Sequence, residues 1–166
     1  MADGGASTYI FLATALLISG AVSAVLISQY GDMTSAMEVE RRAAEADSKT
    51  SFDYAGDLSN VAYDTTNPAA ETITIYLQNT GVYVLDDTSL FIQLDGVSVP
   101  DADVSTTILP SGGDWGTTEL LEVEMTGTWG FADNSDIKLT ILVFSVTVGG
   151  YEGQESQSTE ARLNEL

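Results

Sequence analysis

An uncharged stretch near the N-terminus constrains this chain more than any other feature. Residues 8–30, TYIFLATALLISGAVSAVLISQY, contain no Asp, Glu, Lys or Arg over 23 positions. About 20 helical residues cross the hydrocarbon core of a bilayer. A soluble helix normally keeps one polar face, whereas the polar groups here are hydroxyls, Gln29 and the terminal tyrosines Tyr9 and Tyr30. The sequence therefore predicts a helix of transmembrane length over residues 8–30, behind a short polar N-terminus of residues 1–7.

Three interpretations of this helix compete: a permanent membrane anchor, a cleaved secretory signal, and the central helix of a filament subunit. A secretory signal has a basic N-terminal region and an apolar core of about 7 to 15 residues. Here the first seven residues hold Asp3 and no Lys or Arg, and the apolar stretch is longer. We therefore expect an anchor or a filament helix.

Small residues lie where two such helices would pack. Gly20 and Ala24 are four positions apart, a spacing that lets helix backbones approach closely inside a membrane. They are the predicted helix-packing residues and favour self-association. The alternative is that they are ordinary small residues of an apolar helix.

The helical pattern continues past the uncharged stretch. Residues 32–49 are rich in Ala, Glu and Arg and contain no Pro, a composition typical of helices. We expect one helix over residues 8–48, longer than a bilayer requires. Its second part fits either a narrow seam between helices, through Ala36, Val39, Ala43 and Ala46, or a solvated stalk.

The composition excludes several classes of function. Among 166 residues there are 25 acidic and 5 basic ones, for a net charge of −20, yet 44% are hydrophobic. So many apolar residues argue against intrinsic disorder, and so few basic ones argue against nucleic-acid binding. The chain has neither Cys nor His, which removes thiolate and imidazole nucleophiles and the usual zinc sites. We expect a non-catalytic protein without a cofactor.

From residue 49 onward the pattern changes from helical spacing to alternation. In residues 71–78, ETITIYLQ, the apolar Ile73, Ile75 and Leu77 occupy every second position, as in a strand with one buried face. Asp95-Gly96 between two apolar runs predicts a tight hairpin turn. Further strands are expected at residues 89–94, 119–125 and 136–148, with weaker ones at 51–58, 81–85, 97–99 and 104–109. This set of short strands predicts an immunoglobulin-like antiparallel β-sandwich over residues 49–151.

The last residues, 152–166, show no strand pattern. They are expected to form a C-terminal tail that is either frayed or contains a short helix from Ser158. The predicted β domain therefore ends at residue 151.

Most of the negative charge lies in the predicted β domain. From Ser51 onward there are 19 acidic and two basic residues, a net charge of −17. Such an acidic surface favours surroundings of high ionic strength, where salt screens the repulsion. Clustered loop carboxylates are also typical ligands of divalent cations, although no EF-hand pattern is present. The candidate cation ligands are Asp101 and Asp103, with the pairs Asp86 and Asp87, and Asp133 and Asp136, as further candidates.

Two segments resemble the archaeal flagellin superfamily. They are STYIFLATALLISGAVSAVLIS, residues 7–28, and ETITIYLQNTGVYVLD, residues 71–86, followed by LFIQLDG at residues 90–96. A strand ending in Asn-Thr-Gly and a second ending in Asp-Gly look most like the archaellum stator proteins, the archaeal flagellar proteins F and G. The resemblance covers residues 8–99 and implies a type IV pilin-like layout. In that layout the helix is embedded in a membrane or filament, and the sandwich lies outside the cytoplasmic membrane, where it contacts the surface layer.

The charges around the helix conflict with this orientation. Arg41, Arg42 and Lys49 follow the uncharged stretch and no basic residue precedes it, so the positive-inside rule alone would leave the β domain in the cytoplasm. Long domains cross membranes largely regardless of charge. We therefore expect the extracytoplasmic orientation that the resemblance implies.

The expected function is a non-catalytic structural part of the archaellum, anchoring or stator-like, that links the filament or membrane to the cell envelope or surface layer. The main alternative is a filament-forming archaellin or archaeal pilin subunit. A further alternative is a membrane-anchored surface domain that binds a cation or a carbohydrate. The expected partners are the membrane through the helix, further copies of the chain, and surface-layer or archaellum proteins, with no nucleic acid.

Overall fold

The computed structural model describes residues 4–110 and 112–166. The chain divides after Arg42 into two compact units, and each is described by itself. The first holds most of one long helix. The second begins at Ala43 with the end of that helix and holds the β-sheet.

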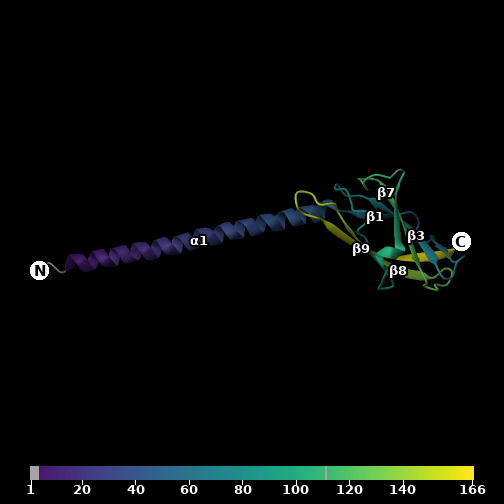
Figure 1. The fold of residues 1–166 in the computed structure, drawn as a ribbon, viewed down its shortest axis with the longest axis horizontal. Coiled ribbons are helices and arrows are strands. Elements are labelled where there is room, and N and C mark those ends of the chain that lie inside the picture. The colour runs from purple at the N-terminus through teal and green to yellow at the C-terminus, as the bar shows by residue number, and fades with distance from the viewer. Residues whose placement is uncertain (1–3, 111) are drawn as a thin grey trace. The chain divides into compact units, whose positions relative to one another are not determined.

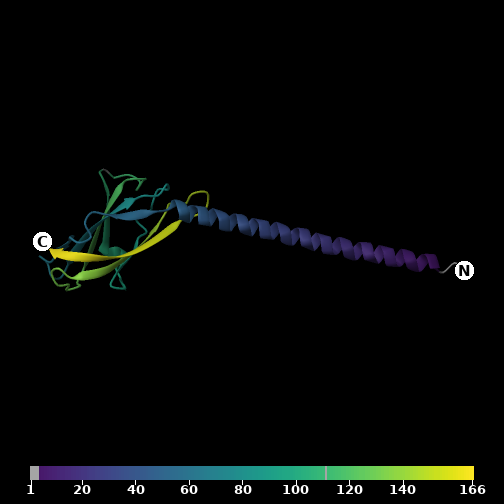
Figure 2. The ribbon, with the colours of Figure 1, turned by 180° about the vertical axis from the view of Figure 1, so that it is seen from behind.

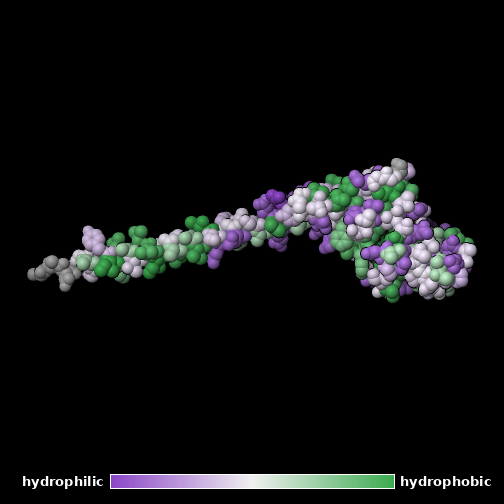
Figure 3. All heavy atoms as spheres, viewed as in Figure 1, coloured by the Kyte–Doolittle hydropathy of each residue, from purple (hydrophilic) through white to green (hydrophobic). Residues whose placement is uncertain are grey.

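The helix α1 extends over Gly4–Lys49 and contains 46 residues. It confirms the predicted long N-terminal helix and continues without a break through Gly31. Hydrophobic side chains lie exposed along its N-terminal part, and hydrophilic ones gather toward its other end (Figure 3). The hydroxyl of Thr14 donates to the carbonyl oxygen of Ile10 at 2.8 Å, so this polar group is satisfied within the helix.

By its length and composition, α1 is able to cross a membrane. None of its apolar window is buried inside the structure, which distinguishes it from the core helix of a soluble protein. A signal sequence near an N-terminus also meets these criteria of length and composition. The finding therefore establishes an exposed apolar helix of membrane-spanning length.

The second unit contains nine strands and one short 3-10 helix among its described residues. In chain order they are β1 (Phe52–Ala55), β2 (Val61–Asp64), β3 (Glu71–Asn79), β4 (Phe91–Leu94), β5 (Val97–Ser98), η1 (Asp101–Asp103), β6 (Val104–Leu109), β7 (Leu120–Gly127), β8 (Asp136–Phe144) and β9 (Gln154–Glu165). Four of the predicted strands, at 71–78, 89–94, 119–125 and 136–148, correspond to β3, β4, β7 and β8.

The strands form one sheet in the order β5-β4-β8-β9-β2-β3-β7-β6, with β1 also paired to β3. Its halves are joined by β2 and β9, which run parallel. The sheet curls into a half-barrel in which β8 and β9 lie side by side (Figures 1 and 2). The prediction of a β domain after a long apolar helix is confirmed. The predicted immunoglobulin-like sandwich is not confirmed, because strand pairing is continuous from β5 to β6.

Alternating side chains on the long strands build the hydrophobic core. On β3 the predicted inward residues Ile73, Ile75 and Leu77 are buried. Their register partners on β7 are buried as well, namely Met125, Val123 and Leu121. Trp115 is the largest fully buried side chain. The period of two in the sequence therefore identifies the core face of these strands correctly.

The C-terminal segment is a strand, which corrects the predicted tail. β9 is the longest strand of the sheet, with 12 residues, and is neither frayed nor helical from Ser158. Its first inward side chains, Glu155 and Gln157, are polar because they bond the backbone of β1, whereas Ala161 and Leu163 further along the strand are buried in the core. The Glu155 carboxylate accepts from the Phe52 N–H at 3.2 Å, and the Gln157 amide donates to the Phe52 carbonyl. Side chains thus replace backbone pairing between β9 and β1, and the usual apolar alternation is missing from the first part of β9.

Two further predictions differ from the structure. Residues 81–85 were expected to form a weak strand, but they form a loop with isolated bridges at Leu85. The short strand β2 was not predicted, because only Val61 and Tyr63 of its four residues are buried. Such a short pattern does not stand out from loop sequence.

The hairpin predicted at Asp95-Gly96 is confirmed. Both residues have positive φ, 50° and 81°, as the turn between β4 and β5 requires. The Asp95 carboxylate also accepts from the backbone N–H of Lys138 at 2.7 Å. The turn is therefore tied to the neighbouring strand β8.

Candidate functional site: the collar around the end of the helix

The end of α1 is built into the β domain. Residues 43–50, the helix root, belong to the same compact unit as the sheet. Ala46 is only 3% exposed. Its carbonyl oxygen accepts both the backbone N–H of Thr50 at 3.1 Å and the Thr50 hydroxyl at 2.9 Å. The last turn is therefore capped by its own threonine and packed against the domain.

The segment before β9 approaches one side of the helix root. A Cβ atom on Gly153 would lie 2.2 Å from the Ala46 carbonyl oxygen and 2.2 Å from the Thr50 hydroxyl, so only glycine fits. The backbone N–H of Gln154 donates to the Asp47 carboxylate at 3.0 Å. The buried Ser145 holds this segment in place, because its hydroxyl accepts from the Gly153 N–H at 2.9 Å.

The loop after β3 also approaches the helix root. A Cβ atom on Gly81 would lie 2.6 Å from both the Lys49 carbonyl oxygen and the Ser51 nitrogen. The same Lys49 carbonyl accepts from the N–H groups of Val82 at 2.8 Å and Tyr83 at 3.3 Å. A carbonyl that the helix itself leaves unpaired is thus satisfied by the domain. We call residues 79–83 together with residues 145–154 the collar.

Asn79 organises the first half of the collar. Its side chain is fully buried. The amide nitrogen donates to the carbonyl oxygens of Tyr83 and Trp115, both at 2.9 Å, and the amide oxygen accepts from the Gly81 N–H at 2.9 Å. The string Asn79-Thr80-Gly81 therefore has a physical role, in which the asparagine shapes the loop and the glycine lets it reach the helix root.

Lys49 adds a polar contact at the rim of the collar. Its ammonium group lies 2.6 Å from the Glu45 carboxylate and 5.4 Å from the centre of the Tyr83 ring. The hydrogen bond to Glu45 is the main cause that raises the pKa of Lys49. The pair is partly exposed and lies within one helix, so it contributes little stability compared with the buried backbone contacts.

The contacts of the collar hold the end of the helix in place. Its contacts are backbone hydrogen bonds, a buried amide and two glycines at van der Waals limits. Such an arrangement resists withdrawal or rotation of the helix end, because either movement would leave buried polar groups without partners.

The predicted helix-packing residues lie in the first unit. Gly20 and Ala24 are exposed positions of α1. A Cβ atom on Gly20 would meet nothing within 4 Å. The structure thus leaves this face open, and helix packing there stays a prediction.

The candidate cation ligands are distributed over several loops. Asp101 and Asp103 are exposed on η1, and Asp101 shares a hollow of about 200 Å³ with Asp87. Among the described residues, no group of three or more acidic side chains is placed to hold a metal ion. Cation binding by these pairs therefore stays a prediction.

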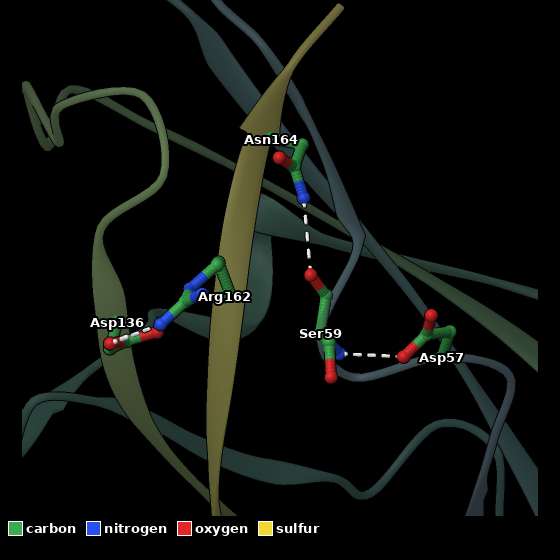
Figure 4. A network of polar contacts seen from close by, with 5 residues as sticks. All are labelled: Asp57, Ser59, Asp136, Arg162 and Asn164. Carbon is green, nitrogen blue, oxygen red and sulfur yellow. Dashed lines mark hydrogen bonds and ion pairs between the residues drawn. The ribbon is translucent and has the colours of Figure 1, made fainter.

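Other predicted acidic residues already have structural partners. The Asp136 carboxylate binds the Arg162 guanidinium at 2.7 and 2.9 Å (Figure 4). That contact lowers the pKa of Asp136 and raises the pKa of Arg162. Asp133 accepts from the Glu165 N–H at 3.0 Å, and Asp86 accepts from the Thr88 N–H at 2.9 Å.

Polar side chains also tie the turn after β1 to β9. The Asn164 amide donates to the Ser59 carbonyl at 3.3 Å, and the Ser59 N–H donates to the Asp57 carboxylate at 2.9 Å (Figure 4). Together with the Arg162–Asp136 contact, they tie β9 to β8 and to the turn before β2. Their role is to fix the sheet.

Sequence reasoning missed a buried carboxylate at the start of β3. Glu71 is 7% exposed and accepts three hydrogen bonds, from the Tyr63 hydroxyl at 2.7 Å and from the N–H groups of Trp129 at 2.7 Å and Gly130 at 2.8 Å. These bonds lower the pKa of Glu71, and the bond from the Gly130 N–H has the largest effect. Burial is the main cause that raises the pKa of Tyr63 to about 12. Nothing in the local pattern predicts this network, because its members come from three separate segments.

Comparison with known proteins gives no relative that decides function. No protein-family model and no curated protein matches the chain. Similar solved structures include the secreted serine protease VesC from Vibrio cholerae, with 12% identity over 71% of this chain and 23% of that one, at a TM-score of 0.31. The GAE domain of yeast GGA1 has 13% identity over 66% of this chain and 97% of that one, also at 0.31. AvmM, which catalyses macrocyclization in alchivemycin A biosynthesis, has 11% identity over 71% and 90%, at 0.30. Similarity at this level carries no argument about function.

Proposed function

We propose that this chain is a non-catalytic structural component of a cell envelope, anchored by α1 and presenting its β domain on the extracytoplasmic side. The proposal rests on one observation: an exposed apolar helix ends in the collar, which holds its last turn by backbone hydrogen bonds and close packing. Whatever holds the helix therefore also holds the domain. In its most specific form, the proposal is a stator-like part of the archaellum that links filament or membrane to the envelope or surface layer.

The exposed side chains of α1 support an apolar environment for it. Large hydrophobic side chains cover the helix on all sides, among them Ile10, Phe11, Leu16, Leu17, Val22, Leu26 and Ile27. Burying one such side chain contributes about 1.5 to 3 kcal/mol. A helix with this many exposed apolar groups is stable only inside lipid or among other helices.

Other features support the proposed archaellum role, the proposed fold relationship and the proposed surroundings of the β domain. The Asn-Thr-Gly string that carries the archaellum resemblance lies in the collar. We infer that the half-barrel is a variant of an immunoglobulin-like sandwich in a type IV pilin-like layout. The charge of −17 after residue 50 suits a domain in salty surroundings.

A filament-forming archaellin or pilin subunit is the second candidate. The open surface at Gly20 favours it, because close packing of many helices needs small residues without steric cover. Purification of the native assembly separates the two candidates. Long filaments made only of this chain would support the filament subunit and reject the stator.

Membrane fractionation of a charged variant tests the anchoring function. Leu17→Arg and Val22→Arg together place two charges in the uncharged stretch, at about 2.5 to 3.5 kcal/mol each near a bilayer centre. We expect the unaltered chain in the membrane fraction and this variant in the soluble fraction. Met37→Arg, in the charged part of α1, is the control and should stay with the membrane. A double variant that remains in the membrane fraction would overturn the proposal.

A further inference from the structure

One outer surface of the sheet is free of charge. Eight side chains point outward from three adjacent strands: Phe91 and Gln93 of β4, Thr140, Leu142 and Phe144 of β8, and Gln154, Ser156 and Ser158 of β9. We call these eight residues the neutral face. The register places them in rows, since Phe91 is paired with Leu142 and Leu142 with Ser156. They therefore form one continuous patch.

The absence of charge is unusual for this domain. The other end of the sheet carries Glu122 and Glu124 on the outward side of β7, beside Ser105 and Thr107 of the edge strand β6. Tyr76 on β3 also binds Glu122 there, at 2.9 Å. On a domain with 19 acidic residues, a second acidic surface can approach without strong repulsion at the neutral face and not at the β7 surface.

The neutral face has the composition of an interface core. Phe91 is 42% exposed, and Leu142 lies next to it on β8. Amide and hydroxyl side chains surround these apolar groups, and one pair of hydroxyls, Thr140 and Ser158, is bonded at 2.9 Å. Depletion of charged residues with an exposed aromatic group is the compositional mark of protein interfaces.

The charges at one end of the neutral face, next to Thr140 and Ser158, are complementary to themselves, whereas Asp86 and Glu152 lie near Phe144 at the other end. Lys138 and Arg162 are the two basic residues after Ser51, and both lie at the first of these ends. Lys138 of β8 is paired with Glu160 of β9, and Asp136 of β8 with Arg162 of β9. Positive and negative groups thus alternate both along each strand and between the two strands. If β8 of one copy faces β9 of another, each charge meets an opposite one.

We propose that the neutral face is an interface between two copies of this chain, related by a two-fold axis that runs between β8 and β9. Lys138 then lies opposite Glu160 of the second copy, and Asp136 opposite Arg162 of the second copy. Leu142 packs over Ser156 of the second copy, and the acidic β7 surfaces point away from each other. A two-fold contact of this kind uses the same patch on both copies. It is separate from helix packing at Gly20 and does not depend on where α1 is anchored.

Cysteine cross-linking of the full chain tests this interface. The chain has no Cys, so each introduced thiol is unique. Ser156→Cys lies on the neutral face, and Ser105→Cys, equally exposed on β6, is the matched control. With a short bis-maleimide in high salt, we expect a covalent dimer from Ser156→Cys and at least tenfold less from Ser105→Cys.

A second change checks that the patch itself causes the cross-link. Leu142→Glu adds a charge on an outward position of β8 and should abolish the Ser156→Cys dimer, while the tryptophan fluorescence of the β domain stays unchanged. Equal cross-linking at both positions would mean that the helices alone bring the domains together and would overturn the interface. A Ser156→Cys chain that gives no dimer, or one that persists with Leu142→Glu, would do the same. None of these results bears on membrane fractionation, so the two proposals fail separately.

Discussion

At the scale of single residues, the collar depends on atoms that leave no space for a side chain. Gly153 faces the Ala46 carbonyl and the Thr50 hydroxyl at distances that a Cβ atom would make impossible without movement. The obstacles are mostly backbone, which cannot rotate away as the tip of a side chain can. Strain at this position must therefore appear as lost stability.

Gly153→Ala should lower the free energy of unfolding of the β domain by about 1 to 3 kcal/mol, as overpacked sites do. Urea unfolding followed by the fluorescence of Trp115 and Trp129 measures it. The matched control is Gly112→Ala, where a Cβ atom meets nothing within 4 Å, and it should change stability by less than about 0.5 kcal/mol. Equal stability of the two variants would contradict the close approach.

Asn79→Ala should be destabilising for a different reason. It removes the amide that binds the Tyr83 and Trp115 carbonyls. The Trp115 oxygen keeps the Leu85 N–H as a donor at 3.0 Å, whereas the Tyr83 oxygen loses its side-chain donor, at about 1 to 3 kcal/mol. The same urea experiment measures the loss. Gln78→Ala, on a partly exposed neighbour, should have a much smaller effect, and a reversed order would show that Asn79 does not organise the collar.

At the scale of elements, the sequence predicts those helices and strands that show in a regular local pattern. It misses those that depend on contacts with residues far away in the chain. β3 and β7 were predicted because their apolar residues alternate regularly over several positions, and α1 because its first part holds no charge over 23 positions. β9 was missed because Glu155 and Gln157 serve the backbone of β1. The string Asn79-Thr80-Gly81 was visible as a turn, but its approach to Lys49 depends on a contact about 30 positions back along the chain.

Glu71 makes the β domain sensitive to acid. Because its pKa is lowered in the folded state from the ordinary 4.5, its contribution to stability is complete above that value and is lost as pH falls through the lowered pKa. Glu71→Gln should flatten the acid end of the stability curve, measured as urea midpoints against pH. Glu124→Gln, which changes an exposed carboxylate, should show the same acid dependence of stability as the unaltered chain. An unchanged curve for Glu71→Gln would show that other carboxylates cause the loss.

The helix root should behave as part of the β domain in truncated chains. A fragment of residues 43–166 keeps Ala46, Thr50 and the Lys49 carbonyl that the collar binds. A fragment of residues 51–166 lacks all three and exposes the collar. We expect the shorter fragment to unfold at a clearly lower urea concentration, and equal midpoints would contradict the role of the collar.

At the scale of the whole molecule, the charge and the hydrophobicity of the chain separate into two parts. The uncharged residues 8–30 lie in an exposed apolar helix long enough to cross a membrane, and the residues from Ser51 onward carry −17. The collar fixes the end of the helix to the domain, so an anchor for one part is an anchor for both. In the proposed function, α1 therefore holds the acidic β domain outside the cytoplasmic membrane.

Labelling of intact cells tests this claim most directly. In the Ser105→Cys chain the thiol is unique and exposed on β6. A membrane-impermeant maleimide applied to intact cells should label it to the same extent as after lysis, while a cytoplasmic thiol protein in the same cells is labelled only after lysis. Labelling of Ser105→Cys only after lysis would place the β domain in the cytoplasm and contradict the account.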